Sequence, residues 1–145
     1  MSICYLNGGF VPRSEARISP MDRGFLFGDG VYEVIPVYGG RAFRLDAHLA
    51  RLERSLAGIG IANPHSHAEC ADLVQRLVAA HHWPTQAVYV QVTRGADTVR
   101  NHAFPQDLPP TVFMTADALA PIPAEQLERG VSAVSAAASC CWVSS

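Results

Sequence analysis

The chain has 145 residues, 49% of them hydrophobic, which is enough for one globular domain with a core of its own. A formal net charge of −2 gives no excess of positive charge, so neither nucleic acid nor a membrane surface is expected as a partner. Because no apolar run reaches the roughly 20 residues of a bilayer span and the N-terminus lacks a signal-peptide layout, we expect a cytoplasmic protein.

The first part of the chain predicts strands. Residues 3–12 read as a hairpin around Asn7-Gly8-Gly9, since an Asn-Gly pair between apolar runs is a strong turn signal. Residues 30–38 are β-branched and aromatic and predict a strand, in which Pro36 favours an edge or a bulge. Residues 41–44 are expected to return antiparallel to it.

Two helices should follow. Leucines at helical spacing predict the first over residues 46–59, with Asp46 as its cap, and a second is predicted over residues 66–82. Further on, strands are predicted at 87–94, at 111–115 and from Val131, with a loop at 95–110 and a short helix at 124–129. The expected fold is α+β, an antiparallel sheet packed with two helices.

One count limits the chemistry. All eleven basic residues are arginine, so the chain contains no lysine. A mechanism that needs a lysine amine cannot run on this chain alone. The histidines have no spacing that fits a metal shell, so no metal is expected; His65, His67, His81 and His82 are interpreted as surface and cap residues.

The most distinctive part of the sequence begins with the motifs DRG at 22–24 and GDG-V-Y-E at 28–33, followed by H-L-A-R-L at 48–52. Glycines around an arginine and two aspartates suggest a tight loop pinned by charge-assisted hydrogen bonds. The whole run MDRGFLFGDGVYEVIPVYGGRAFRLDAHLARL, residues 21–52, resembles the class IV (fold type IV) pyridoxal-phosphate-dependent aminotransferases, and within them the D-amino-acid transaminases.

This resemblance implies that residues 1–136 are the N-terminal lobe of a homodimeric pyridoxal 5'-phosphate enzyme. It implies that Arg51 contacts the cofactor phosphate, a role that suits a planar, permanently charged guanidinium. It also implies that the Tyr32 hydroxyl holds the substrate carboxylate, together with Arg100 and His102 from the neighbouring subunit. His48 is interpreted as a packing or capping residue.

The family's reactive half is expected to be missing. In these enzymes a lysine holds the cofactor as a Schiff base, and a glutamate pairs with the pyridinium nitrogen. The resemblance places the segment that leads to this lysine at about residues 137–145, but the chain has an uncharged tail there. We therefore expect the lysine and the C-terminal cofactor domain to be absent. A frameshift or misplaced stop near Ala136 is our hypothesis for the tail.

The implied function is transamination between a D-amino acid and a 2-oxo acid, with no turnover by this chain alone. One alternative keeps the fold and changes the chemistry to that of an aminodeoxychorismate lyase, a branched-chain transaminase or an amine transaminase; Arg100 and His102 argue against it. An alternative of another class is a non-catalytic remnant that only dimerises or binds a partner, which the lack of lysine favours.

Overall fold

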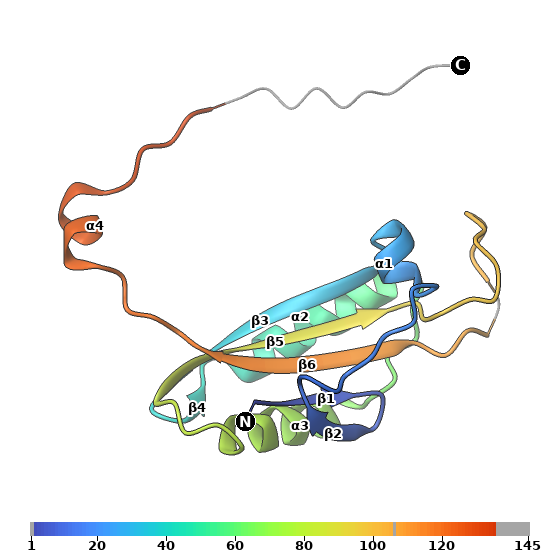
Figure 1. Ribbon diagram of the computed structural model, residues 1–145, viewed down its shortest axis with the longest axis horizontal. Coiled ribbons are helices and arrows are strands. Elements are labelled where there is room, and N and C mark those ends of the chain that lie inside the picture. The colour runs from blue at the N-terminus through green and yellow to red at the C-terminus, as the bar shows by residue number, and fades with distance from the viewer. Residues whose placement is uncertain (1, 106, 136–145) are drawn as a thin grey trace.

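The computed structural model describes residues 2–105 and 107–135, and its centre is an antiparallel sheet of six strands in the order β2-β1-β6-β5-β3-β4 (Figure 1). The strands are β1 (Ile3–Leu6), β2 (Gly9–Pro12), β3 (Gly30–Tyr38), β4 (Arg41–Ala42), β5 (Thr85–Thr93) and β6 (Thr111–Ala118). The helices are α1 (Arg23–Phe27), α2 (Leu45–Gly58), α3 (His67–Ala79) and α4 (Ala124–Arg129).

The N-terminal hairpin forms as predicted. β1 and β2 pair across the turn, where Asn7 and Gly8 both have positive φ, 45° and 100°. An Asn-Gly pair tolerates this conformation, which matches the twist of the strands on either side. The turn therefore sets the register of the sheet edge at β2.

β3 carries the alternation that the sequence predicts. Tyr32 and Val34 are exposed on one face, while Glu33, Ile35 and Val37 are buried on the other. Pro36 is accommodated next to the sheet edge, because only the two-residue strand β4 lies beyond β3 and the Pro36 carbonyl accepts a bond from the amide of Phe43. The face that contains Glu33 is the one covered by a helix.

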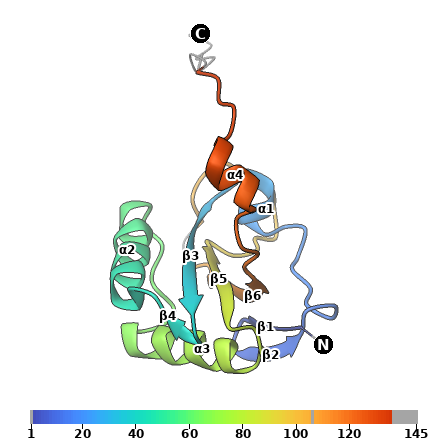
Figure 2. The ribbon, with the colours of Figure 1, turned by 90° about the vertical axis from the view of Figure 1, so that its left-hand side faces the viewer.

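Helices α2 and α3 cover that face of the sheet (Figure 2). Leu49, Leu52 and Leu56 of α2 are about 1% exposed and pack on the buried residues of β3 and β5 in one apolar core. Burial of each leucine stabilises the fold by about 1.5–3 kcal/mol. The fold is α+β, with an antiparallel sheet packed by two helices, as expected.

The cap predicted for α2 is wrong. The helix begins at Leu45, its N-cap is Arg44 in the left-handed conformation (φ 50°), and no side chain caps it. Asp46 lies one residue inside the helix, which is too late for an N-cap. Its carboxylate instead contacts His67 Nε2 at 3.2 Å, so it links α2 to α3.

α3 begins at a complete capping box and ends earlier than predicted. The Ser66 hydroxyl accepts from the amide of Glu69, and the Glu69 carboxylate accepts from the amide of Ser66. His81, beyond the helix, is not a surface residue. It is buried, its Nδ1 donates to the Leu77 carbonyl, and its Nε2 accepts the amide of Ile3 at 3.3 Å.

After β6 the chain leaves the sheet, and α4 stands apart from it (Figure 1). The short helix predicted at 124–129 is confirmed, but the strand predicted from Val131 is wrong for the described residues 131–135, which are exposed and not in a strand. A strand needs a neighbour for its backbone groups, and these residues pair with none in the described chain. The tail 137–145 lies outside the described residues.

Within the parts that the structure describes, no helix is long and apolar enough to cross a membrane.

Candidate functional site

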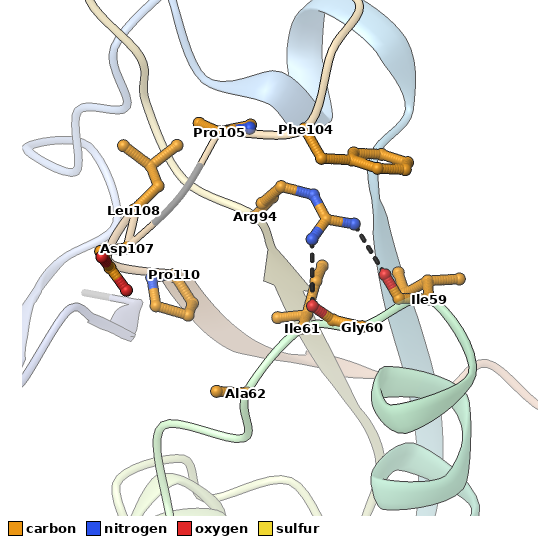
Figure 3. Close-up of a pocket in the computed structure, with 10 residues that line it drawn as sticks. All are labelled: Ile59, Gly60, Ile61, Ala62, Arg94, Phe104, Pro105, Asp107, Leu108 and Pro110. Atoms are coloured by element: carbon orange, nitrogen blue, oxygen red, sulfur yellow. Dashed lines mark hydrogen bonds between the residues drawn. The ribbon is translucent and has the colours of Figure 1, made fainter.

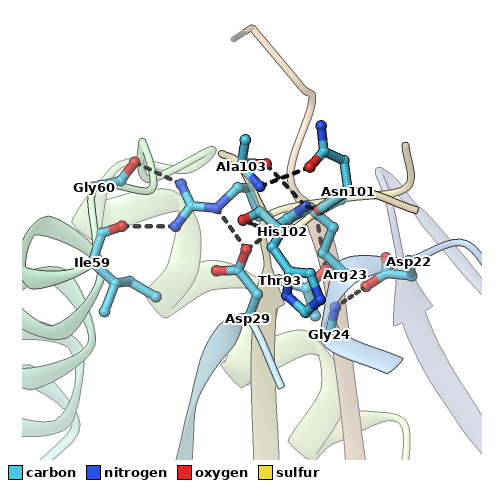
Figure 4. Close-up of polar contacts among 12 residues, drawn as sticks. Asp22, Arg23, Gly24, Asp29, Ile59, Gly60, Thr93, Asn101, His102 and Ala103 are labelled. Atoms are coloured by element: carbon cyan, nitrogen blue, oxygen red, sulfur yellow. Dashed lines mark hydrogen bonds and ion pairs between the residues drawn. The ribbon is translucent and has the colours of Figure 1, made fainter. Parts of the chain in front are cut away.

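The DRG segment forms the turn into α1. Asp22 caps this helix by accepting the amide of Gly24 at 2.8 Å (Figure 4). Its other oxygen accepts the Thr111 hydroxyl at 2.6 Å. Gly28 ends the helix with φ 67°, a conformation that glycine adopts without a steric penalty. The predicted pinning by charge-assisted hydrogen bonds is present, but the segment contains the short helix α1 where a loop was expected. Asp22 also ties it to the start of β6.

A buried ion cluster lies just after this turn. The Asp29 carboxylate accepts from Nε of Arg23 and from Nε of Arg94, each at 2.8 Å, and all three side chains are 10% exposed or less. Burial alone would raise the pKa of Asp29, but the hydrogen bonds from Arg94 and Arg23 outweigh it and hold that pKa below its ordinary value. We call these three residues the Asp29 cluster.

The Asp29 cluster holds the loop that contains Arg100 and His102. Arg23 Nη1 donates to the carbonyl of Asn101 at 2.7 Å and to that of Ala103 at 3.4 Å, and Nη2 donates to the carbonyl of His102 at 3.4 Å (Figure 4). An arginine fork suits several acceptors at once. A residue of the DRG motif thus fixes the backbone of a loop 78 residues away.

Arg94 supports the same loop from its other side. Its guanidinium lies 4.3 Å from the centre of the Phe104 ring and donates to the carbonyls of Ile59 and Gly60 (Figure 3). The cavity beside it, of about 400 Å³, separates the α2–α3 connection from the loop. Because the Arg94 donors already bond Asp29 and these carbonyls, we assign Arg94 to the loop's support.

Arg100 and His102 are both exposed and both contact Phe27 of α1. The Arg100 guanidinium lies 5.0 Å from the centre of the Phe27 ring, and the His102 ring centre lies 5.0 Å from it. The structure therefore brings these two predicted residues together on one aromatic platform, with their polar groups accessible.

Tyr32 lies on the uncovered face of β3. It is 66% exposed, so it is not a core tyrosine, and its ring stacks on Tyr89 of β5 with centres 5.7 Å apart. The pKa of Tyr89 is raised mainly by its burial and to a smaller extent by the nearby Tyr32. Within the described residues, no hydrogen bond, ring stacking or cation–π contact joins Tyr32 to Arg100 or His102, since Tyr32 stacks on Tyr89 and the other two lie on Phe27.

Arg51 is bound to a buried carboxylate that we did not anticipate. Its Nε and Nη2 donate to the two oxygens of Glu33 at 2.5 and 2.6 Å, and Nδ1 of His48 bonds the second oxygen at 2.9 Å. Burial would raise the pKa of Glu33, but the bonds from Arg51 and His48 outweigh it and lower that pKa. Glu33 also raises the pKa of Arg51. We call Glu33, His48 and Arg51 the Glu33 cluster.

The exposure of the Glu33 cluster is asymmetric. The Glu33 side chain is 3% exposed, whereas that of Arg51 is 59% exposed. Arg51 and His48 line a hollow of about 350 Å³ together with Arg44 and Arg54. Even with Glu33 compensating one of them, the three arginines leave this hollow with a positive excess, which suits a phosphate group.

Three residues that shape these sites were not predicted as functional: Glu33, Arg23 and Arg94. His48 was interpreted as packing or capping, yet it bonds Glu33. One signal was available, because Glu33 falls on the buried face of β3 by period-two alternation, and a buried carboxylate needs a charged partner. That partner could not be identified from spacing.

Comparisons with known proteins agree on one family. A profile of the amino-transferase class IV family matches residues 30–143. The D-alanine aminotransferase of Listeria monocytogenes is 42% identical over 113 residues, 78% of this chain and 39% of that protein. That of Staphylococcus aureus is 40% identical over 134 residues, 92% of this chain and 47% of that protein.

Solved structures confirm the fold. The branched-chain amino acid aminotransferase of Escherichia coli has a TM-score of 0.77 at 20% identity, over 85% of this chain and 42% of that one. The 4-amino-4-deoxychorismate lyase of Pseudomonas aeruginosa has a TM-score of 0.71 at 28% identity, over 88% of this chain and 44% of that one. This chain spans less than half the length of each of these relatives. Since the family profile covers most of its residues, the chain belongs to the amino-transferase class IV family.

Proposed function

We propose that this chain is the recognition lobe of a pyridoxal-phosphate-dependent D-amino-acid aminotransferase. The observation that carries the proposal is the exposed Arg51 guanidinium, oriented by a buried carboxylate within a hollow lined by arginines. Relatives named D-alanine aminotransferase, 40–42% identical, support the D-amino-acid class. The reaction would move an amino group from a D-amino acid to a 2-oxo acid.

The hollow fits the phosphate end of the cofactor. Arg51 would bind the phosphate, since a fixed guanidinium suits two of its oxygens, and the nearby Arg44 and Arg54 would add positive charge. When bound, pyridoxal 5'-phosphate supplies the electron sink that amino-group transfer requires. Within this lobe, the chain's own task is to anchor that group.

The substrate carboxylate would be held by Tyr32 of one subunit and by Arg100 and His102 of its partner in a homodimer. On one chain Tyr32 stacks on Tyr89, whereas Arg100 and His102 lie on Phe27, and a symmetric pair of subunits can bring such groups together. Arg100 and His102 are exposed on a loop fixed by Arg23, as ligands supplied to another subunit need to be.

A hybrid-dimer experiment tests this division. The 134 residues that align with the Staphylococcus aureus enzyme replace their counterparts in it, and the resulting chimera is made as Tyr32→Phe and as Arg100→Gln. If the site is shared, each homodimer is impaired, whereas mixed and reassociated chains recover up to about a quarter of the unsubstituted activity, because half of the dimers have one intact site. No recovery on mixing would contradict the shared site.

The chain by itself should not turn over. It contains no lysine, so the amine that this chemistry needs is missing. With D-alanine, a 2-oxo acid and pyridoxal 5'-phosphate, we expect product at the rate of the cofactor alone. Enzymatic turnover by the purified chain would contradict this part of the proposal.

A second candidate is a non-catalytic protein that dimerises or binds a partner. The lack of lysine favours it, since the chain has no amine to form the family's Schiff base with the cofactor. The two candidates differ in phosphate recognition, because a remnant under no demand to bind the cofactor has no need to keep Arg51 oriented.

A further inference from the structure

The Glu33 cluster contains a residue whose position suggests a role beyond packing. We propose that Glu33 is a positioning residue, which holds the Arg51 guanidinium in the orientation that binds a phosphate monoester dianion. The inference rests on the phosphate role proposed above for Arg51. Glu33 itself does not touch the phosphate and acts through Arg51.

The geometry provides a rigid clamp. Both oxygens of Glu33 accept from Arg51, at 2.5 and 2.6 Å, so the plane of the guanidinium is fixed and not only its distance. Glu33 lies in the middle of a sheet strand and Arg51 lies on a helix packed over that strand. Sites built on strands and helices are held more accurately than sites on loops.

His48 completes the clamp from α2. Its Nδ1 lies 2.9 Å from the Glu33 oxygen that also accepts Arg51 Nη2. Because a carboxylate only accepts, this nitrogen donates, which fixes the tautomer of a neutral imidazole. Two side chains one turn apart on α2 therefore hold the carboxylate, and the carboxylate holds the cation.

Two effects of Glu33 on a phosphate oppose each other. Its negative charge weakens anion binding, whereas its two hydrogen bonds remove the rotational freedom that a 59% exposed arginine otherwise keeps in water. The first effect is reduced because the charge is already neutralised by Arg51 and bonded to His48. We infer that orientation outweighs repulsion, so the neutral variant Glu33→Gln binds phosphate less tightly despite removing a negative charge.

A first measurement needs no ligand. In the full chain, the NMR signal of the Arg51 Nε–H should exchange slowly with water, because this group donates to a buried carboxylate. Glu33→Gln should make that exchange fast. The matched control is Glu125→Gln, which makes the same substitution in the exposed Glu125–Arg129 pair on α4 and should leave the Arg51 signal unchanged. Fast exchange in the unsubstituted chain would overturn the inference.

A second measurement uses the phosphate. Pyridoxamine 5'-phosphate and pyridoxamine differ only in this group, and neither reacts with amines, so the ratio of their affinities reports phosphate recognition alone. Glu33→Gln should lower that ratio roughly three- to tenfold, the cost of immobilising one free side chain on binding. A change in overall stability would weaken both ligands and leave the ratio unchanged. A ratio that rises would show that repulsion dominates and would overturn the inference.

A double-mutant cycle shows whether Glu33 acts through Arg51. In an Arg51→Gln background the Glu33 charge has lost its arginine partner, so Glu33→Gln should leave the ratio unchanged or raise it. A further drop would overturn the inference. Arg51→Gln alone tests the proposed function. If the affinity ratio is unchanged in this variant, Arg51 does not bind the phosphate. If Arg51→Gln lowers the ratio and Glu33→Gln does not, the function stands and the positioning role falls.

Discussion

Asp29 and Glu33 are each bonded by two basic side chains, but the two clusters differ in whether the bonded arginines are buried or exposed. In the Asp29 cluster both arginines are buried with the carboxylate. In the Glu33 cluster the carboxylate is buried but Arg51 is 59% exposed. The first cluster directs its remaining donors to backbone carbonyls, and the second leaves a cation facing an open hollow.

The difference teaches how burial decides what an ion pair does. A cation enclosed with its partner must satisfy its donors inside the protein, so Arg23 and Arg94 join distant segments of backbone. A cation held at the surface by a buried anion is oriented yet still accessible to a ligand. We therefore assign stability mainly to the Asp29 cluster and recognition mainly to the Glu33 cluster.

The largest effect is expected when the Asp29 carboxylate is neutralised. Asp29→Asn leaves two buried guanidinium groups without a counter-charge and should lower the free energy of unfolding by about 3–5 kcal/mol, as for other broken buried pairs. Urea denaturation measures this, with Glu125→Gln as the exposed control. If Asp29→Asn lowers the free energy of unfolding by less than Glu33→Gln does, the Asp29 cluster is not the main source of stability.

A smaller effect is expected from Arg23→Lys, which keeps the charge and removes the fork. One ammonium cannot reach Asp29 and the carbonyls of Asn101, His102 and Ala103 together, so the loop should loosen. Amide hydrogen exchange at residues 98–104 should rise several-fold while exchange in β5 stays slow. Arg129→Lys on α4 is the control. If exchange in the loop is unchanged in Arg23→Lys, the Arg23 fork does not hold the loop in place.

Glu33→Gln should cost less stability than Asp29→Asn. The amide keeps the shape and one acceptor, and the exposed Arg51 can turn into solvent, so we expect a loss of about 1–2 kcal/mol from the weakened hydrogen bonds. Urea denaturation of both variants side by side gives the answer. A loss equal to that of Asp29→Asn would mean that the Glu33 cluster is structural as well.

The smallest effect concerns acid. The folded-state pKa of Asp29 lies below its ordinary value of 3.8, so its charge stabilises the fold above that pH, and the contribution fades as pH falls through the folded pKa. The stability gap between the unsubstituted chain and Asp29→Asn should thus be constant near neutral pH and shrink below about pH 4. A gap that grows with acid would contradict the sign of this shift.

Local patterns predicted the hairpin, the exposed and buried faces of β3, and the two long helices, because each depends on neighbouring residues. The ion clusters depend on contacts across the fold. Glu33 and Arg51 are 18 residues apart, and Arg23 reaches a loop 78 residues away, so neither pairing could be identified before the packing of α2 and the path of the loop were known.

The errors have the same origin. His81 was interpreted as a surface and cap residue. It does bond the Leu77 carbonyl at the end of α3, but it is buried, stacks on Trp83 and accepts the amide of Ile3, which is 78 residues away in the sequence. The strand expected from Val131 had a suitable composition, but a strand forms only where another backbone receives its hydrogen bonds.

The most direct test of the central claim is the rate at which the chimera described above transfers the amino group of D-alanine. If this lobe recognises the cofactor phosphate and the substrate, the chimera should be active, and Arg51→Gln should lower its kcat/KM at least tenfold, the loss of about 1.4 kcal/mol in transition-state stabilisation. Arg129→Gln should leave it unchanged. A folded, dimeric, cofactor-loaded chimera without D-alanine transamination would contradict the account.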